Sequence, residues 1–170
     1  MLIVLKLCYW VVNQGRQMTE EIQALLVLSD EVPVAALIEA LEIQYIRIDR
    51  AQTCKEAGWR LTSSDPPHVV FTDPELADGS WTDVMNLAAK AVLPVAVVVI
   101  SPSADVRLYV DIIERRAFDM ITHSFSVMEL SPIVRSAVDY VVSRRKGWAR
   151  LPVEGARIAL PSGATIVKEI

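Results

Sequence analysis

The chain has 170 residues, a length that fits one domain with a hydrophobic core of its own. Hydrophobic residues make up 52% of it and charged residues 22%, a balance that excludes an intrinsically disordered chain. The net charge of −4 provides no broad attraction to nucleic acid, so no nucleic-acid partner is expected.

The N-terminal residues 1–12 are strongly apolar but interrupted by Lys6. They are too few to span a bilayer, and they lack the charged start and cleavage site of a secretory signal, so no membrane partner is expected. Met18 begins a run typical of the start of a domain. We therefore interpret residues 1–21 as an N-terminal extension that results from a start assigned upstream of Met18. A weak membrane or partner anchor is the alternative.

Strands and helices are expected to alternate from residue 24 onward, the pattern of a parallel α/β sheet. Apolar runs predict strands, and helical spacing of apolar residues predicts the helices between them. The predicted strands are 24–28, 45–48, 69–72, 95–100 and 118–121. The predicted helices begin at Pro33, cover 51–61, run from Ser80 to about Lys90, and cover 104–116 and 126–145.

The pattern changes after Gly147. Residues 157–160 and 165–168 flank Pro161-Ser162-Gly163, which predicts a β-hairpin in a C-terminal extension of residues 147–170. An extension of this length is too short for an independent output domain.

Four minor features have unremarkable interpretations. The basic run 144–146 is expected to complement the dipole at the end of the last helix. Trp81 is expected to pack, and His68 to lie at the surface. Cys54 and the other cysteine, Cys8, form neither a disulfide framework nor a metal pattern, which favours a cytoplasmic protein with reduced thiols.

Polar side chains follow the apolar runs where four predicted strands end. These residues are Asp30, Asp73, Ser101 and His123. In an open α/β sheet the carboxyl ends of the strands form the edge where ligands bind. Each aspartate alone would be an ordinary turn or helix cap. Together they predict one small anionic site.

This arrangement resembles the receiver domain of two-component response regulators (CheY-like), over roughly residues 22–145. The 22-residue separation of Ser101 and His123 fits the family's spacing from hydroxyl to lysine. Ala117-Phe118-Asp119 is similar to the family's Gly-Ala-x-Asp-Tyr stretch, and Ser124-Phe125 stands where Pro-Phe is usual. The resemblance implies a flavodoxin-like (βα)5 fold in a receiver domain of residues 22–146, with a five-stranded parallel sheet and helices on both faces.

The resemblance also implies roles for the strand-end residues. Asp73 matches the aspartate that accepts a phosphoryl group from a sensor histidine kinase or phosphotransfer protein, and a carboxylate can act as such a nucleophile. Asp30, Asp73 and the backbone carbonyl of Glu75 match ligands of Mg²⁺, a cation that prefers oxygen. Ser101 matches the hydroxyl that binds the phosphoryl oxygens. His123 stands at the lysine position.

Three positions depart from the family pattern. Ser29 replaces one member of the acidic pair and contributes no charge. His123 carries a certain positive charge only if a nearby phosphate raises its pKa. Met120 stands where a switch aromatic is usual.

The leading hypothesis is a stand-alone signalling switch and not an enzyme. Phosphorylation of Asp73 would bias the 104–145 face toward a downstream protein or a homodimer. The alternative is a degenerate receiver that binds a partner without phosphorylation, which the three departures favour. A flavodoxin-like enzyme or nucleotide binder is disfavoured because the sequence has neither G-x-G-x-x-G nor a P-loop.

Overall fold

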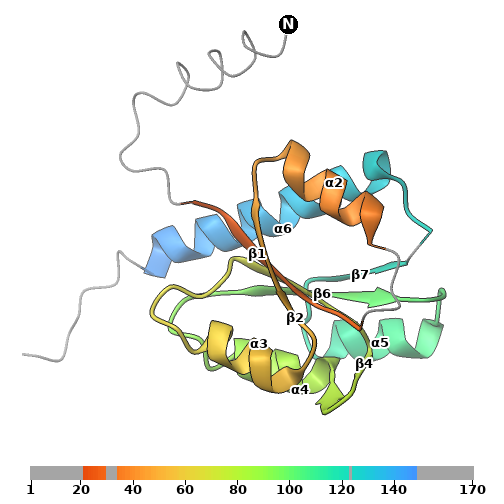
Figure 1. Ribbon diagram of the computed structural model, residues 1–170, viewed down its shortest axis with the longest axis horizontal. Helices are drawn as coiled ribbons and strands as arrows, with labels where there is room; N and C mark the ends of the chain where they lie inside the picture. Colours follow the sequence, from red (N-terminus) through yellow and green to blue (C-terminus); the bar gives the residue numbers. More distant parts are fainter. Residues whose placement is uncertain (1–20, 30–33, 123, 149–170) are drawn as a thin grey trace, which may run out of the picture.

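A computed structural model describes residues 21–29, 34–122 and 124–148, which form a parallel five-stranded sheet covered by helices on both faces (Figure 1). The sheet order is β2-β1-β3-β6-β7, with every neighbouring pair parallel. This is the doubly wound flavodoxin-like order, so the predicted fold class is confirmed. The strands are β1 Gln23–Val27, β2 Arg47–Ala51, β3 Val69–Thr72, β6 Ala96–Ser101 and β7 Asp119–Thr122, and a separate short hairpin pairs β4 Glu75–Leu76 with β5 Gly79–Ser80.

Four helices connect the strands in the described part of the chain, and a fifth follows the last strand. They are α2 Ala35–Ile43, α3 Cys54–Leu61, α4 Trp81–Ala88, α5 Val106–Glu114 and α6 Val127–Trp148. In Figure 1, α2 and α6 lie above the sheet, and α3, α4 and α5 lie below it. No helix among the described residues is long and apolar enough to cross a membrane.

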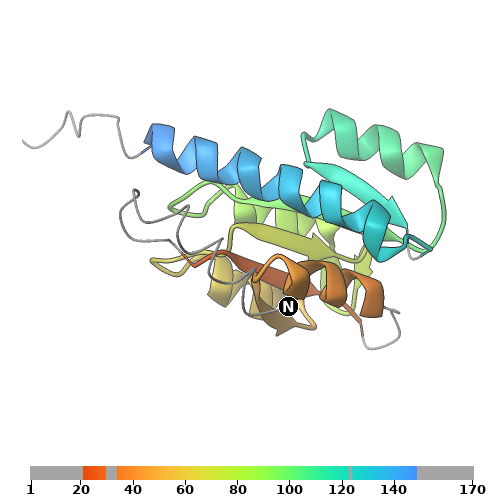
Figure 2. The same ribbon diagram turned by 90° about the horizontal axis from the view of Figure 1, so that it is seen from above.

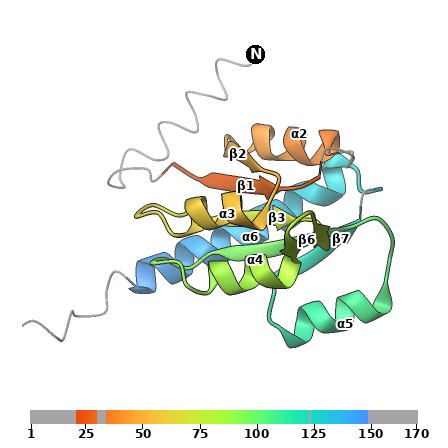
Figure 3. The same cartoon turned by 60° about the horizontal axis from the view of Figure 1, so that its bottom comes forward.

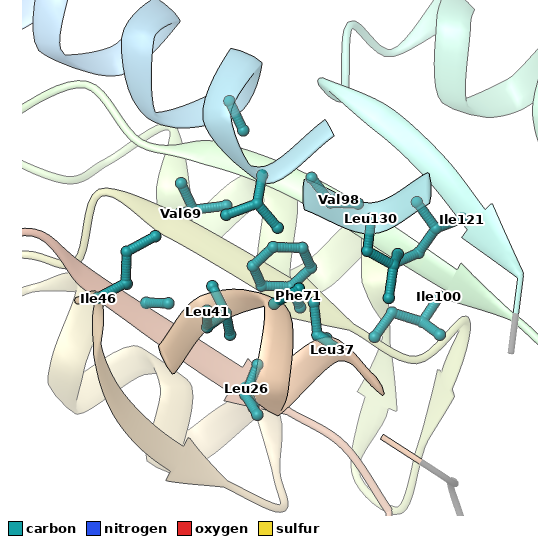
Figure 4. Close-up of a cluster of buried hydrophobic side chains, with 14 of the residues drawn as sticks. Leu26, Leu37, Leu41, Ile46, Val69, Phe71, Val98, Ile100, Ile121 and Leu130 are labelled. Carbon is teal, nitrogen blue, oxygen red and sulfur yellow. The ribbon is translucent and has the colours of Figure 1, made fainter. Parts of the chain in front are cut away.

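The larger core lies between the sheet and the pair α2 and α6, which pack side by side (Figure 2). Its centre is Phe71, which is fully buried and contacts apolar side chains from both helices and from the neighbouring strands (Figure 4). Leu41 of α2 and Leu130 of α6 close the cluster from above. The central strands are apolar on both faces because helices cover them on both sides.

The opposite face is covered by α3, α4 and α5 (Figure 3). Residues of β1, β3 and β6 that point this way pack against α3 and α4. A separate small cluster joins Trp81 and Val99 to Ile112 of α5. Trp81 is 5% exposed, so its predicted packing role is confirmed.

Several element boundaries differ from the prediction by a few residues, and two of these differences have clear local causes. Tyr45, predicted to begin a strand, has a φ of 57°, a left-handed conformation that ends α2 in a turn and delays β2 to Arg47. The next helix starts at Cys54 and not at residue 51, because the side chain of Thr53 caps it by accepting a hydrogen bond from the backbone of Glu56 (3.2 Å). The predicted hairpin of residues 157–168 and the extension 1–20 lie outside the described residues.

The prediction that His68 is a surface residue is wrong. Its side chain is 1% exposed, and its Nδ1 accepts a hydrogen bond from the backbone N–H of Gln23 (3.2 Å). The imidazole fixes the loop before β3 to the start of β1. A residue just before a strand is buried here because α6 passes over that end of the sheet.

The basic run at the end of α6 also does more than complement a helix dipole. Arg145 is 5% exposed and donates hydrogen bonds to the carbonyl oxygens of Pro66 (2.9 Å), Pro67 (2.8 Å) and Pro94 (3.0 Å). Its Nη1 lies 3.2 Å from Nε2 of His68. One guanidinium therefore joins the last helix to the loops before β3 and β6.

Replacing this guanidinium is expected to destabilise the domain. Arg145→Met would keep the aliphatic bulk but leave buried carbonyl oxygens without their donor, at a cost of about 3 kcal/mol of unfolding free energy. Urea denaturation measures the loss. Lys146→Met is the matched control, because Lys146 is exposed on the same turn and its loss should cost less than about 0.5 kcal/mol. Equal effects from the two substitutions would contradict this role of Arg145.

Candidate functional site

The candidate site lies at the carboxyl ends of β1, β3 and β6. Asp73 directly follows β3, and its backbone N–H donates to the carbonyl oxygen of Val27 at the end of β1 (3.1 Å). The connections from β1 and β3 leave on opposite faces of the sheet, so this edge contains the switch point at which doubly wound folds bind ligands. Asp73 therefore lies at the position where a fold of this kind is most expected to bind a ligand.

The carboxylate of Asp73 is buried and held from one side only. Its side chain is 4% exposed. Oδ2 accepts two hydrogen bonds from Ser29, one from the backbone N–H (2.8 Å) and one from the hydroxyl (2.9 Å). These two donors fix the orientation of the carboxylate, because both hydrogen bonds would have to break before the side chain could rotate.

The second oxygen of Asp73 has a different environment. Oδ1 is buried and has no hydrogen-bond partner among the described residues. A carboxylate oxygen without a partner in a protein interior is costly, so it is expected to bind a cation, a donor or a reacting atom. Of the two oxygens, Oδ1 is therefore the one whose hydrogen-bonding capacity is unused by the described residues.

Ser101 ends β6, the strand next to β3, and is 2% exposed. Its hydroxyl donates to the carbonyl oxygen of Ser103 in the following loop (2.6 Å). The hydroxyl is thus engaged with its own loop and not with Asp73. A group bound at Oδ1 could accept a hydrogen bond from this hydroxyl only if the hydrogen bond to Ser103 breaks.

The loop after Asp73 is held in place by Asp78. The two strands β4 and β5 form a short hairpin, and the carboxylate of Asp78 at its tip accepts hydrogen bonds from the backbone N–H groups of Cys54 (2.7 Å) and Lys55 (3.0 Å). These bonds lower the pKa of Asp78 and satisfy free donors at the start of α3. The signal for this hairpin in the sequence is Asp78-Gly79, a pair typical of a tight turn.

Gly79 permits a close approach at this hairpin. A Cβ built there would lie 2.9 Å from Sγ of Cys54 and 2.8 Å from Oδ2 of Asp83, so a side chain at this position would force one of these two groups to move. Asp83 in turn accepts a hydrogen bond from the backbone N–H of Ser80, which confirms Ser80 as the start of α4 (2.9 Å). The hairpin therefore packs against α3 and α4 at once.

Cys54 is a poor nucleophile in this setting. Burial, followed by the nearby negative charges of Asp78 and Asp83, raises the pKa of its thiol from 9.0 to about 11. The thiol is a structural contact beneath the hairpin and is not a reactive group.

The predicted site residues are only partly brought together by the described structure. Asp73, Ser29 and Ser101 lie on adjacent strand ends, and Glu75 lies in β4 just after Asp73. Asp30 and His123 lie outside the described residues. Met120, at the switch-aromatic position, is partly buried against the cluster that contains Trp81.

The described residues offer only part of a site for Mg²⁺. The described residues contain no group of three or more His, Cys, Asp or Glu side chains that could hold a metal. The unpartnered Oδ1 of Asp73 and the backbone carbonyl of Glu75 are nevertheless oxygen donors of the kind that a hard cation prefers. A magnesium ion fits this donor set provided that Asp30 completes it.

Comparisons with known proteins identify the fold. No family model and no curated protein matches the sequence. Solved structures do match. The signal receiver domain of an HD domain-containing protein from Pseudomonas fluorescens Pf-5 is 20% identical, with a TM-score of 0.66 over 80% of this chain and 98% of that one.

Two further structures agree. A response regulator from Thermotoga maritima is 20% identical, with a TM-score of 0.61 over 71% of this chain and 99% of that one. A CheY-like receiver domain protein from Methanospirillum hungatei JF-1 is 15% identical, with a TM-score of 0.60 over 72% and 98%. The chain therefore has the receiver fold of response regulators, which confirms the resemblance seen in the sequence.

The environment of Cys54 gives a test of how firmly Asp78 holds the hairpin. With the pKa of the thiol near 11 in place of 9.0, Cys54 in a Cys8→Ser background should carry about a hundredfold less thiolate at pH 8 than an unperturbed thiol. Its labelling by a thiol reagent should be slow in proportion. Asp78→Ala should speed labelling at least about tenfold, because it removes both a raising charge and the anchor of the hairpin.

Asp111→Ala is the matched control, since Asp111 is an exposed carboxylate on α5 away from the hairpin. Fast labelling of Cys54 in the unaltered hairpin, or no response to Asp78→Ala, would contradict the anchoring by Asp78.

Proposed function

We propose that the chain is a signalling receiver that accepts a phosphoryl group on Asp73 from a sensor histidine kinase or a phosphotransfer protein. The observation that supports this most is the asymmetry of Asp73, a buried carboxylate with Oδ2 bonded to Ser29 and Oδ1 without a partner. A carboxyl group that serves only as a helix cap, such as that of Asp105, lies at the surface, where water satisfies the oxygen that the cap leaves unused, whereas Oδ1 of Asp73 is buried.

In the proposed reaction Oδ1 attacks the phosphorus of the donor. A bond forms between Oδ1 and phosphorus, the bond from phosphorus to the donor nitrogen breaks, and the electron pair leaves with that nitrogen, which takes up a proton. The product is an acyl phosphate. Ser29 holds Oδ2 throughout, so Asp73 meets the donor in one orientation.

Ser101 is placed to respond to the added group. Its hydroxyl now donates to the carbonyl oxygen of Ser103. A phosphoryl oxygen is a stronger acceptor than a carbonyl, since hydrogen bonds to charged groups are roughly twice as strong. Phosphorylation would therefore draw the hydroxyl from Ser103 and move the loop between β6 and α5.

Asp73, Asp30 and the backbone carbonyl of Glu75 are the groups that would hold Mg²⁺. When bound, this ion supplies positive charge that neutralises the phosphoryl oxygens. Ser29 adds no charge of its own to the set.

The proposed output surface lies on α5 and its neighbours, within the 104–145 face. Four apolar residues on α5 follow the helical spacing i, i+3, i+4, i+7 and are exposed. They are Val106 (75%), Tyr109 (46%), Val110 (47%) and Ile113 (53%). Exposing such an apolar stripe to water is unfavourable for a helix that has no partner. The stripe could bind a downstream protein or a second copy of the chain.

A second candidate function is a degenerate receiver that binds its partner without phosphorylation. The specific observation in its favour is the Ser29 hydroxyl, which donates to Asp73 from the position where the family has a metal-binding acid. A hydrogen-bond donor at this position stabilises the carboxylate of Asp73, which is part of what a bound cation would do.

Phosphorylation of the protein itself distinguishes the two candidates. Incubation with acetyl phosphate and Mg²⁺ should add one phosphoryl group to the unaltered chain, detected by intact-mass spectrometry. Asp73→Asn should add none, because the amide is not a nucleophile, while its geometry at Ser29 stays close to native. The absence of any adduct on the unaltered chain would reject the phosphorylated switch in favour of the degenerate receiver.

Ser29→Asp and Ser29→Ala extend the same experiment. The aspartate restores a negative charge beside Asp73 and should lower the Mg²⁺ concentration needed for half-maximal phosphorylation about tenfold. Ser29→Asp removes the hydroxyl donor and adds a charge, whereas Ser29→Ala only removes the donor. Comparing the two variants therefore separates the effect of the added charge from the effect of a less firmly oriented Asp73. An unchanged Mg²⁺ requirement in Ser29→Asp would show that this position does not belong to the metal site.

A further inference from the structure

A groove of about 600 Å³ lies at the edge of the sheet opposite Asp73. It is formed where β6 and β7 begin, between the end of α4 and the end of α6. It is lined by residues 93–97, by residues 116–118, by Met85, Ala88, Ala89 and Ala91 in and after α4, and by Tyr140, Arg144 and Trp148 of α6. The size is that of pockets that bind a small molecule or a short peptide segment.

The lining is apolar and aromatic, with positive charge only. The rings of Phe118 and Tyr140 lie 5.3 Å apart, and the guanidinium of Arg144 stacks over Tyr140 at 5.2 Å. Arg116 is the other charged lining residue, and no carboxylate is present in the lining. Such a groove fits an apolar occupant that carries a negative charge.

Trp148 connects the groove to the rest of the chain. It lines the groove, is 57% exposed, and is the last residue that the structure describes. The sequence continues Ala-Arg-Leu151-Pro152-Val153-Glu154. After Ala149 and Arg150, three apolar residues and then one carboxylate follow in residues 151–154, which is the chemistry that the groove lacks.

We propose that residues 151–154 bind in this groove as an intramolecular ligand, with Leu151 and Val153 against the aromatic rings and Glu154 paired with Arg116. An extended chain covers at most about 3.5 Å per residue, so Glu154 can reach anywhere within about 20 Å of Trp148. The tether also gives the segment an effective concentration in the millimolar range. Weak contacts are therefore sufficient, and Pro152 lowers the ordering cost further.

The consequence goes beyond phosphoryl acceptance. The groove is lined by the residues that join α5 to β7 and by the end of α6, both parts of the 104–145 face. A segment bound there would hold these elements together from the edge opposite the phosphorylation site. The extension would then be a structural part of the receiver and not a separate output module.

The proposal is tested on the full chain by NMR. Nuclear Overhauser contacts are expected between the methyl groups of Leu151 or Val153 and the rings of Phe118 or Tyr140. Leu151→Asp should abolish them and shift the indole signal of Trp148. Leu160→Asp is the matched control, because it places the same change in the same extension outside the proposed contact, and it should leave the contacts intact.

A charge exchange tests the ion pair separately. Arg116→Glu and Glu154→Arg should each weaken the contacts, and the double variant should restore them. The proposal is overturned if the native chain shows no such contacts, or if Leu151→Asp and Leu160→Asp act alike. It is also overturned if the contacts depend on protein concentration, since the occupant would then be a second copy. Absence of phosphorylation at Asp73 would leave these results unaffected.

Discussion

The chemistry of this protein depends on the two hydrogen bonds that Ser29 donates to Oδ2 of Asp73. A buried carboxylate normally needs several donors or a cation to remain charged. Here one residue supplies a backbone donor and a hydroxyl on one side, and Oδ1 is left without a partner among the described residues. The sheet makes this possible, because β1 and β3 are direct neighbours and end together. Ser29 contributes no charge to the site, but it orients the carboxylate of Asp73.

The two edges of the sheet have opposite chemistry. The carboxyl edge gathers Asp73, Ser29 and Ser101 around a small polar site. The amino edge is closed by Arg145, which binds the carbonyl oxygens of two loops, and beside it lies a groove with arginines and aromatic rings. The last helix reaches from one edge to the other (Figure 2). Loop movement at Ser101 and occupation of the groove would thus act on the same helices from two ends.

The sequence was sufficient to predict the sheet and its functional edge, because buried parallel strands are continuous apolar runs and the polar residues that end them are conspicuous. It did not reveal the roles of His68 and Arg145, since their hydrogen-bond partners, which are backbone groups and each other's side chains, lie 45 to 79 residues away along the chain. The hairpin of β4 and β5 has two residues per strand, too few for any periodicity. The hydrogen bonds from Ser29 to Asp73 are hidden in the sequence for a different reason. A serine at the position of an acid indicates the charge that is lost, and it does not indicate the hydrogen-bond donor that is gained.

The most direct test of this account is a crystal structure of the protein treated with beryllofluoride, a mimic of the phosphoryl group, in the presence of Mg²⁺. The account predicts beryllium bonded to Oδ1 of Asp73, both hydrogen bonds from Ser29 to Oδ2 retained, and the Ser101 hydroxyl turned from Ser103 toward the fluorines. Beryllium on Oδ2 with the Ser29 bonds broken would contradict it. An unmodified Asp73 in a crystal that contains both reagents would contradict it as well.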